Sequence, residues 1–134
     1  MNEWESKVKD MIPELIREHA YIYDIGIKNV DHYSSDSLSD FEGLITDHIN
    51  KEETWVFPFM VEHNIYDERS EEIASQHQEI TSMLNTLRRI HGEDFKKRFM
   101  EFLDLLHRHH ANEEGWLFPR VIDYIIAKNS TAAH

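Results

Sequence analysis

One phrase occurs twice in this chain and sets strong limits on its fold. Residues 48–58 read HINKEETWVFP and residues 109–119 read HHANEEGWLFP. In each copy a histidine stands four residues before the first of two glutamates, and this spacing places both side chains on one face of an α-helix. An imidazole and a carboxylate placed in this way can reach one metal ion, or the carboxylate can bridge two ions.

The rest of the chain is also helical by pattern. Its 134 residues include only four glycines and three prolines, so few positions interrupt a helix. Apolar residues recur with a helical period, and no stretch has the pattern of a β-strand. We expect four helices, at about residues 5–30, 38 to the low 60s, 69–90 and 94–127. The sequence therefore predicts an all-α fold, an antiparallel up-down-up-down four-helix bundle that forms a single domain over residues 1–134.

Three polar breaks separate the expected helices. The first, around residues 31–40, is rich in Ser and Asp, which compete for backbone hydrogen bonds and cap helices. Asp67 or Ser70 can cap the third helix, and Gly92 is suited to a C-terminal cap. Pro58 lies inside the second helix, where it should kink that helix or end it early.

The composition excludes several classes of protein. The 26 acidic and 14 basic residues give a net charge of −12, so the chain should repel nucleic acid and anionic membranes and attract cations. Without cysteine, it cannot form disulfides, iron–sulfur clusters or thiolate zinc sites. No run approaches the ~18 consecutive apolar residues of a membrane span, and the N-terminal segment does not resemble a secretory signal. We expect a cytoplasmic protein with no nucleic-acid or membrane partner.

The histidines can be placed by a simple rule, because residues at one level of an antiparallel hairpin lie equally far from its turn. The midpoint of His19 and His48 falls in the first predicted break. The midpoint of His77 and His109 falls beside the third break, and that of residue 50 and His77 falls in the second. One histidine from each helix should therefore meet at one level, with a glutamate one turn away on two of the helices. The predicted metal site comprises His19, His48, Glu52, His77, His109 and Glu113.

Apolar neighbours on the same helix faces indicate that these histidines point into the core. Buried carboxylates are costly unless they are paired or bind a metal, so the group favours a metal site over the alternative, a structural polar network. The tryptophans and phenylalanines of the repeated phrase are most simply core residues, and we assign them no chemistry.

The second copy of the phrase contains an ambiguity. His110 and Glu114 are also four residues apart, and His107 lies three residues before His110. The repeated register favours the pair His109 and Glu113, so we expect His107, His110, Glu53 and Glu114 to flank the site or face solvent. We expect the remaining histidines to lie at the surface: His32, His63, His91 and His134.

The number and type of ligands bear on the metal. Neutral imidazole together with carboxylate suits iron, zinc, manganese or copper. Four histidines and two glutamates are too many for one tetrahedral zinc ion, so two ions bridged by the glutamates fit better. Iron is favoured because bridging carboxylates hold two cations close together and oxygen chemistry uses such pairs. The Glu-x-x-His motif of ferritin-like di-iron proteins does not occur in this sequence.

The four segments EHAYI, HINKEETWVFP, QHQEI and HHANEEGWLFP, in this order, resemble the hemerythrin-like, or HHE cation-binding, family over residues 15 to 125 or so. The resemblance implies a four-helix bundle with a non-haem centre of two iron ions bridged by an oxo or hydroxo group. It also implies that the four histidines of the predicted site are terminal ligands and that Glu52 and Glu113 bridge the ions.

One position departs from the family pattern. Oxygen-carrying hemerythrins have a fifth histidine one turn before the ligand of the third helix, and that position is Ile73 here. Either both ions keep an open or water-filled position, or another side chain fills one. Tyr23, one turn after His19, is a candidate, although packing in the core beside the site is the simpler interpretation; Thr81 is a weaker candidate.

The resemblance implies binding of O2, or of a related small ligand such as NO, for sensing, storage or delivery. The missing fifth histidine leaves alternatives open. One is a di-iron enzyme that acts on peroxide or in nitrosative stress and iron-centre repair. Another is an iron-binding module that regulates a partner. The sequence leaves the oligomeric state open.

Overall fold

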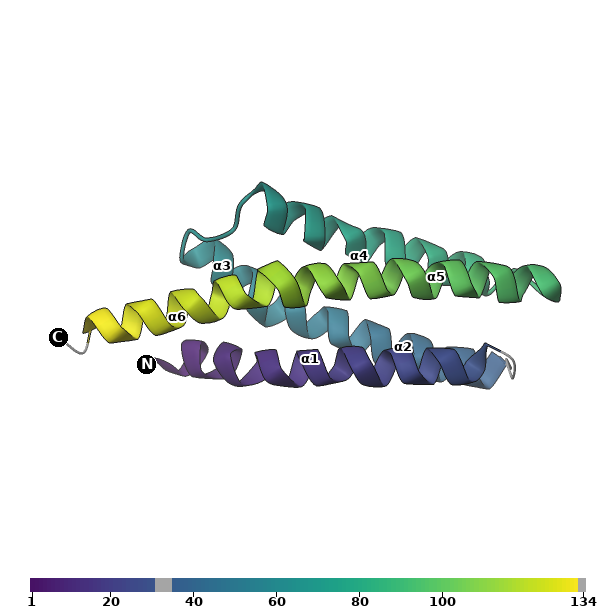
Figure 1. Ribbon diagram of the computed structural model, residues 1–134, viewed down its shortest axis with the longest axis horizontal. Coiled ribbons are helices and arrows are strands. Elements are labelled where there is room, and N and C mark those ends of the chain that lie inside the picture. Colours follow the sequence, from purple (N-terminus) through teal and green to yellow (C-terminus); the bar gives the residue numbers. More distant parts are fainter. Residues whose placement is uncertain (31–34, 133–134) are drawn as a thin grey trace.

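The computed structural model describes residues 1–30 and 35–132, and every regular element in this part of the chain is helical (Figure 1). The α-helices are α1 (Glu3–Asn29), α2 (Ser35–Lys51), α3 (Phe57–Glu62), α4 (Glu68–Leu87), α5 (Glu93–Asn112) and α6 (Phe118–Ala132). Two π-helical turns, Glu52–Val56 and Glu113–Leu117, join α2 to α3 and α5 to α6. The described chain therefore forms four helical rods, which confirms the all-α prediction.

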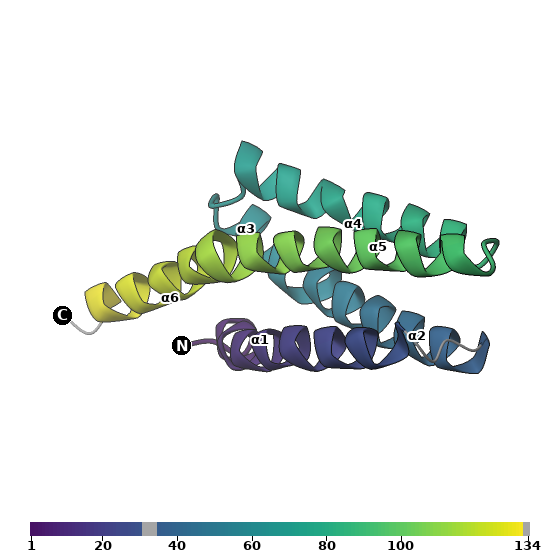
Figure 2. The same cartoon turned by 45° about the vertical axis from the view of Figure 1, so that its right-hand side comes forward.

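The four rods lie along one long axis, as Figures 1 and 2 show from two directions. Helix α1 packs against α2 and α4 packs against α5, while α1 also contacts α5 and α6. This arrangement is consistent with the expected four-helix bundle. None of the described helices is long and apolar enough to cross a membrane.

Both π turns begin at the first glutamate of the repeated phrase and end just before its Phe-Pro pair. A proline has no N–H for the carbonyl four residues earlier, and its ring clashes with that carbonyl. A wider turn avoids the conflict: the N–H of Phe57 reaches the carbonyl of Glu52, and that of Phe118 reaches the carbonyl of Glu113. The second rod therefore continues through Pro58 for another turn, so this proline does not end the helix.

Of the predicted helix caps, the one at Asp67 is present and the one at Gly92 is not, while the cap expected in the first break lies outside the described residues. Asp67 caps α4 by accepting the N–H of Ser70 at 3.1 Å, and the Ser70 hydroxyl accepts the N–H of Asp67 at 3.3 Å. The expectation of a C-terminal cap at Gly92 was wrong, because α4 ends at Leu87 and Gly92 directly precedes α5 with φ +72°. A positive φ favours glycine, which has no Cβ to clash.

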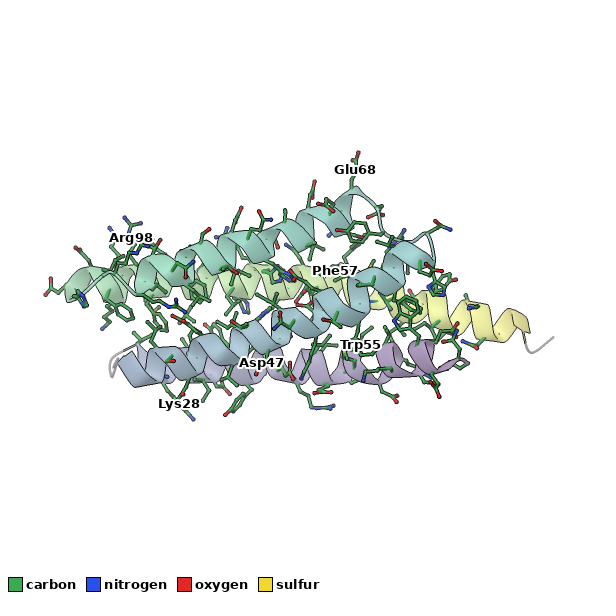
Figure 3. All side chains as sticks on the ribbon, turned by 180° about the vertical axis from the view of Figure 1, so that it is seen from behind. Lys28, Asp47, Trp55, Phe57, Glu68 and Arg98 are labelled. Atoms are coloured by element: carbon green, nitrogen blue, oxygen red, sulfur yellow. The ribbon has the colours of Figure 1, made fainter. Side chains whose placement is uncertain are left out.

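Two apolar clusters fill the interior and are separated by a polar layer. The first includes Leu15, Val56, Phe59, Ile73, Leu117 and Phe118. The second includes Ile22, Phe41, Ile45, Ile80, Phe102 and Leu106. Each rod thus carries buried apolar residues on both sides of the layer, which keep bulk water away from it. Figure 3 shows Phe57 between the rods, whereas the charged side chains of Lys28, Glu68 and Arg98 point outward.

Candidate metal centre

The polar layer between the apolar clusters contains all six residues of the predicted site. The exposed fractions are 4% for His19, 2% for His48 and His109, 3% for His77, and 0% for Glu52 and Glu113. Each rod contributes one of the four predicted histidines to the layer, and the glutamates are the first residues of the two π turns. The structure therefore brings together the six residues that the hairpin rule placed at one level.

Glu113 lies at the centre of this layer and approaches the Nε2 atoms of all four histidines. Its Oε1 is 3.0 Å from His19 Nε2 and 3.8 Å from His48 Nε2. Its Oε2 is 3.4 Å from His109 Nε2 and 3.9 Å from His77 Nε2. Because one carboxylate contacts imidazoles from all four rods, it can serve two neighbouring ions.

Two groups of side chains in the described chain bring their ligand atoms within 4.8 Å of one another. The first group is His19, His48, His110 and Glu113, and the second is Glu52, His77, His109 and Glu113. Glu113 belongs to both groups. Glu52 also reaches both, because its Oε1 lies 3.4 Å from the Nε2 atoms of His48 and His77. The layer can thus hold two cations side by side with the two glutamates between them.

A second set of polar residues orients the four rings from outside. The ring Nδ1 atoms pair with Glu114 for His19 (3.1 Å), Glu18 for His48 (2.9 Å), Glu53 for His77 (3.1 Å) and Gln76 for His109 (2.7 Å). An oxygen that accepts a proton from Nδ1 fixes the tautomer whose Nε2 lone pair faces the centre. Orientation of this kind is typical of histidines that bind metals.

These outer hydrogen bonds form a closed ring around the bundle, since each joins one rod to the next. The sequence analysis expected Glu53 and Glu114 to flank the site or face solvent, and it gave no role to Glu18 and Gln76. Glu18 and Gln76 share a sequence feature that could have identified them, because each directly precedes a site histidine. In the structure each contacts the site histidine of the following rod. Burial opposes ionisation of Glu18, but its hydrogen bonds from Lys51 and from the histidine lower its pKa.

The inner atoms of the layer lack protein partners that could satisfy them. Among the described residues, the buried atoms without a hydrogen-bond partner are Glu52 Oε1 and Oε2, His77 Nε2, His109 Nε2 and Glu113 Oε2. The Nε2 atoms of His19 and His48 face each other at 3.0 Å. Leaving such groups unpaired in a dry interior costs on the order of 1–3 kcal/mol each. Cations bound between them would satisfy all of these atoms at once, so the donor set fits a metal centre.

Without metal, protons take the place of the cations. Burial and the neighbouring Glu113 raise the pKa of Glu52 well above its ordinary value. Burial also acts on Glu113, but the neighbouring Glu52 and the nearby imidazoles of His109 and His19 outweigh it and lower its pKa well below the ordinary value. Burial alone would lower the pKa of His77, yet the two glutamates raise it to about 10. Of the two glutamates, Glu52 is therefore the more readily protonated and Glu113 the more readily ionised, and His77 is protonated at neutral pH.

The position of His110 differs from the expectation that it would flank the site or face solvent. It is only 6% exposed, and its ring stacks on that of His19 with centroids 3.7 Å apart and planes inclined by 9°. Burial, with the neighbouring His19, lowers the pKa of His110 to about 2, so this ring is neutral. His107, by contrast, is exposed. The repeated register could not reveal this difference, because the equivalent position in the first copy is Ile49.

The two hydroxyl side chains proposed as extra ligands lie outside both groups. Tyr23 is 38% exposed, and its ring contacts that of His107 at 5.4 Å. The Thr81 hydroxyl donates to the backbone carbonyl of His77 at 2.9 Å. Ile73 is buried in the first apolar cluster. Of the other histidines, His91 is exposed, His63 is half-buried against Phe59, and His32 and His134 lie outside the described residues.

Two surface grooves lead to this layer from opposite pairs of rods. The groove between α1 and α5, of about 450 Å³, is lined by His19, Tyr23, His107 and His110 among others. The groove between α2 and α4, of about 530 Å³, is lined by Ile49, Glu53, His77, Thr81 and Arg88 among others. A small molecule can therefore approach each group from its own side.

Comparison with known proteins gives one family. The family model described as the hemerythrin HHE cation binding domain matches residues 6–121, a range that contains both candidate groups, two complete rods and most of the other two. No curated protein and no solved structure matches the chain.

Proposed function

Because the chain belongs to the hemerythrin family of HHE cation-binding domains, we propose that its polar layer holds two iron ions that bind O2, or a related small ligand such as NO, for sensing, storage or delivery. The observation that carries this proposal is the pair of donor groups that share Glu113 between two apolar clusters. Metal binding follows from the family and from the donor atoms; the identity of the metal and of the ligand is the proposed step.

In this proposal His19 and His48 bind one ion, His77 and His109 bind the other, and Glu52 and Glu113 bridge them with an oxo or hydroxo group. Two ferrous ions held together supply the electrons that O2 binding requires. The chain contributes the surroundings. Its outer ring of hydrogen bonds would hold the imidazoles in place, and its apolar clusters would exclude the bulk water that competes with a bound ligand.

We also infer that the rods alternate in direction, since the short connections at residues 30–34, 63–67 and 88–92 bring each rod back along the preceding one. A cytoplasmic location belongs to the same proposal, because a chain without cysteine needs no oxidising compartment.

The direct test is to load the metal-free protein with ferrous iron in the absence of O2, count the iron, and then record absorption spectra before and after O2 is admitted. We expect about two iron ions per chain and an absorption band that appears with O2 and disappears on its removal. His107→Ala is the matched control, because this exposed histidine lies on the same helix outside both groups. One bound ion per chain, or a spectrum indifferent to O2, would refute the proposal.

A second candidate is a di-iron enzyme that acts on peroxide or in nitrosative stress and iron-centre repair. The groove between α1 and α5 favours it, because Tyr23 and His107 line this approach to the first group without belonging to it. The enzyme predicts repeated turnover of peroxide or NO that Tyr23→Phe and His107→Ala both slow, whereas a binding protein reacts once per centre.

A further inference from the structure

The metal layer has an internal near-symmetry that follows from the repeated phrase. In this near-symmetry α2 corresponds to α5 and α1 corresponds to α4. His48 then corresponds to His109 and Glu52 to Glu113, and the outer partners of the histidines correspond in the same way. The two surface grooves are exchanged in the same way. A site built only from the six predicted residues would therefore give both ions the same number of imidazoles.

His110 breaks this symmetry. The corresponding residue on α2 is Ile49, which has no atom that can bind a metal. His110 belongs to the first candidate group, where its ring centroid lies 3.7 Å from that of His19 and 5.4 Å from that of His48. The second group contains no third imidazole; its histidines are His77 and His109. The first group thus holds three imidazoles and the second holds two.

The burial of His110 also needs a physical reason. Its ring is 6% exposed and packed against the rings of His19, His48 and His109. A hydrocarbon side chain such as that of Ile49 would fill this space without the cost of removing two ring nitrogens from water. A cation within reach of a ring nitrogen offsets that cost, because neutral imidazole is a strong ligand for transition metals.

Resting on the two-metal site proposed above, we infer that His110 is a fifth imidazole ligand, so that one ion is held by His19, His48 and His110 and the other by His77 and His109. Coordination requires His110 to leave its parallel stack on His19, because two parallel rings 3.7 Å apart cannot both contain one ion in their planes. His110, on α5, would then replace the histidine ligand that is absent at position 73 on α4.

Unequal ligand sets have a functional consequence. Three imidazoles and the bridging carboxylates leave little room for another ligand on the first ion, whereas the second ion has one imidazole fewer. A small ligand would then meet fewer protein ligands at the second ion, on the side where the groove between α2 and α4 reaches His77.

The test is an equilibrium titration of the metal-free protein with Co²⁺, which reports its ligands through its visible absorption and needs no O2. The key variant is His110→Phe, since Phe keeps a ring against His19 but has no nitrogen. We expect two separate binding steps in the unaltered protein. In the variant the tighter step should weaken by about 100-fold or more, beyond the ~10–100-fold effect of losing an outer partner, and the bands of that step should change.

Two further variants complete the design. His107→Phe removes an exposed imidazole from the same helix and groove and should leave both steps unchanged. His110→Ile copies the residue of the first phrase and replaces His110→Phe if that variant does not fold, as judged by circular dichroism of the metal-free protein.

The outcomes separate the two proposals. Fewer than two Co²⁺ ions per unaltered chain would overturn both the two-metal site and the role of His110. Two ions with the same affinities and spectra in His110→Phe would overturn the role of His110 alone. The same holds if only the rate of metal uptake changes, since a ring that merely covers the site alters access without altering affinity.

Discussion

The two central glutamates are chemically identical and equally buried, yet their removal should have unequal consequences in the metal-free protein. Glu113 is the more readily ionised member of the pair, because burial and the neighbouring Glu113 raise the pKa of Glu52 and favour its protonated form. Glu52→Gln therefore replaces a neutral acid with a neutral amide of the same shape. Glu113→Gln removes the negative charge that faces the protonated His77 and lies 3.0 Å from His19 Nε2 and 3.4 Å from His109 Nε2.

The magnitude follows from the contacts that remain. Removing one partner of a buried ion pair costs about 3–5 kcal/mol. Glu53 still lies 3.1 Å from His77 Nδ1, so Glu113→Gln should lower the free energy of unfolding by ~3 kcal/mol, the lower end of that range. Glu52→Gln loses no charge and should cost no more than about 1 kcal/mol.

Urea denaturation followed by circular dichroism at pH 7, with a chelator present, measures both values. The two variants serve as controls for each other, because both should lose tight metal binding. Equal losses of stability, or a larger loss for Glu52→Gln, would refute the assignment of a single negative charge to the pair.

Three other predictions follow from the protonation and the outer contacts of the layer. Metal binding at pH 7 should release at least the proton that His77 carries, because ligands bind in their deprotonated forms; calorimetry in buffers of different ionisation enthalpy measures the number, and no release would contradict it. The raised pKa of His77 stabilises the metal-free fold below its ordinary value of 6.5, and this contribution is lost as pH rises toward about 10. Unfolding free energies measured across this range should therefore fall by up to ~1.4 kcal/mol per pH unit for each proton, and His77→Gln should flatten the slope. Glu18→Gln weakens the partner of His48 Nδ1 and should lower Co²⁺ affinity about 10-fold or more; Glu14→Gln, which contacts only Lys51 among these residues, should not.

Much of this architecture could be predicted from local sequence. A helix repeats every 3.6 residues, so the apolar spacing and the scarcity of glycine and proline specify helices wherever they occur. The hairpin rule then found the level of His19, His48, His77 and His109, because short turns leave little freedom in how far adjacent rods slide past each other. The effect of Pro58 was harder to predict, because a π turn and a broken helix both accommodate a proline that has no N–H to donate.

Sequence alone thus determined the helices and the level at which histidines from each of them meet. Only the tertiary structure decided that both adjacent histidines of α5, His109 and His110, lie in the layer. It also decided that Glu18 and Gln76 support histidines of the next rod. These contacts depend on how each rod is rotated about its own axis, which is set by packing among all the rods together.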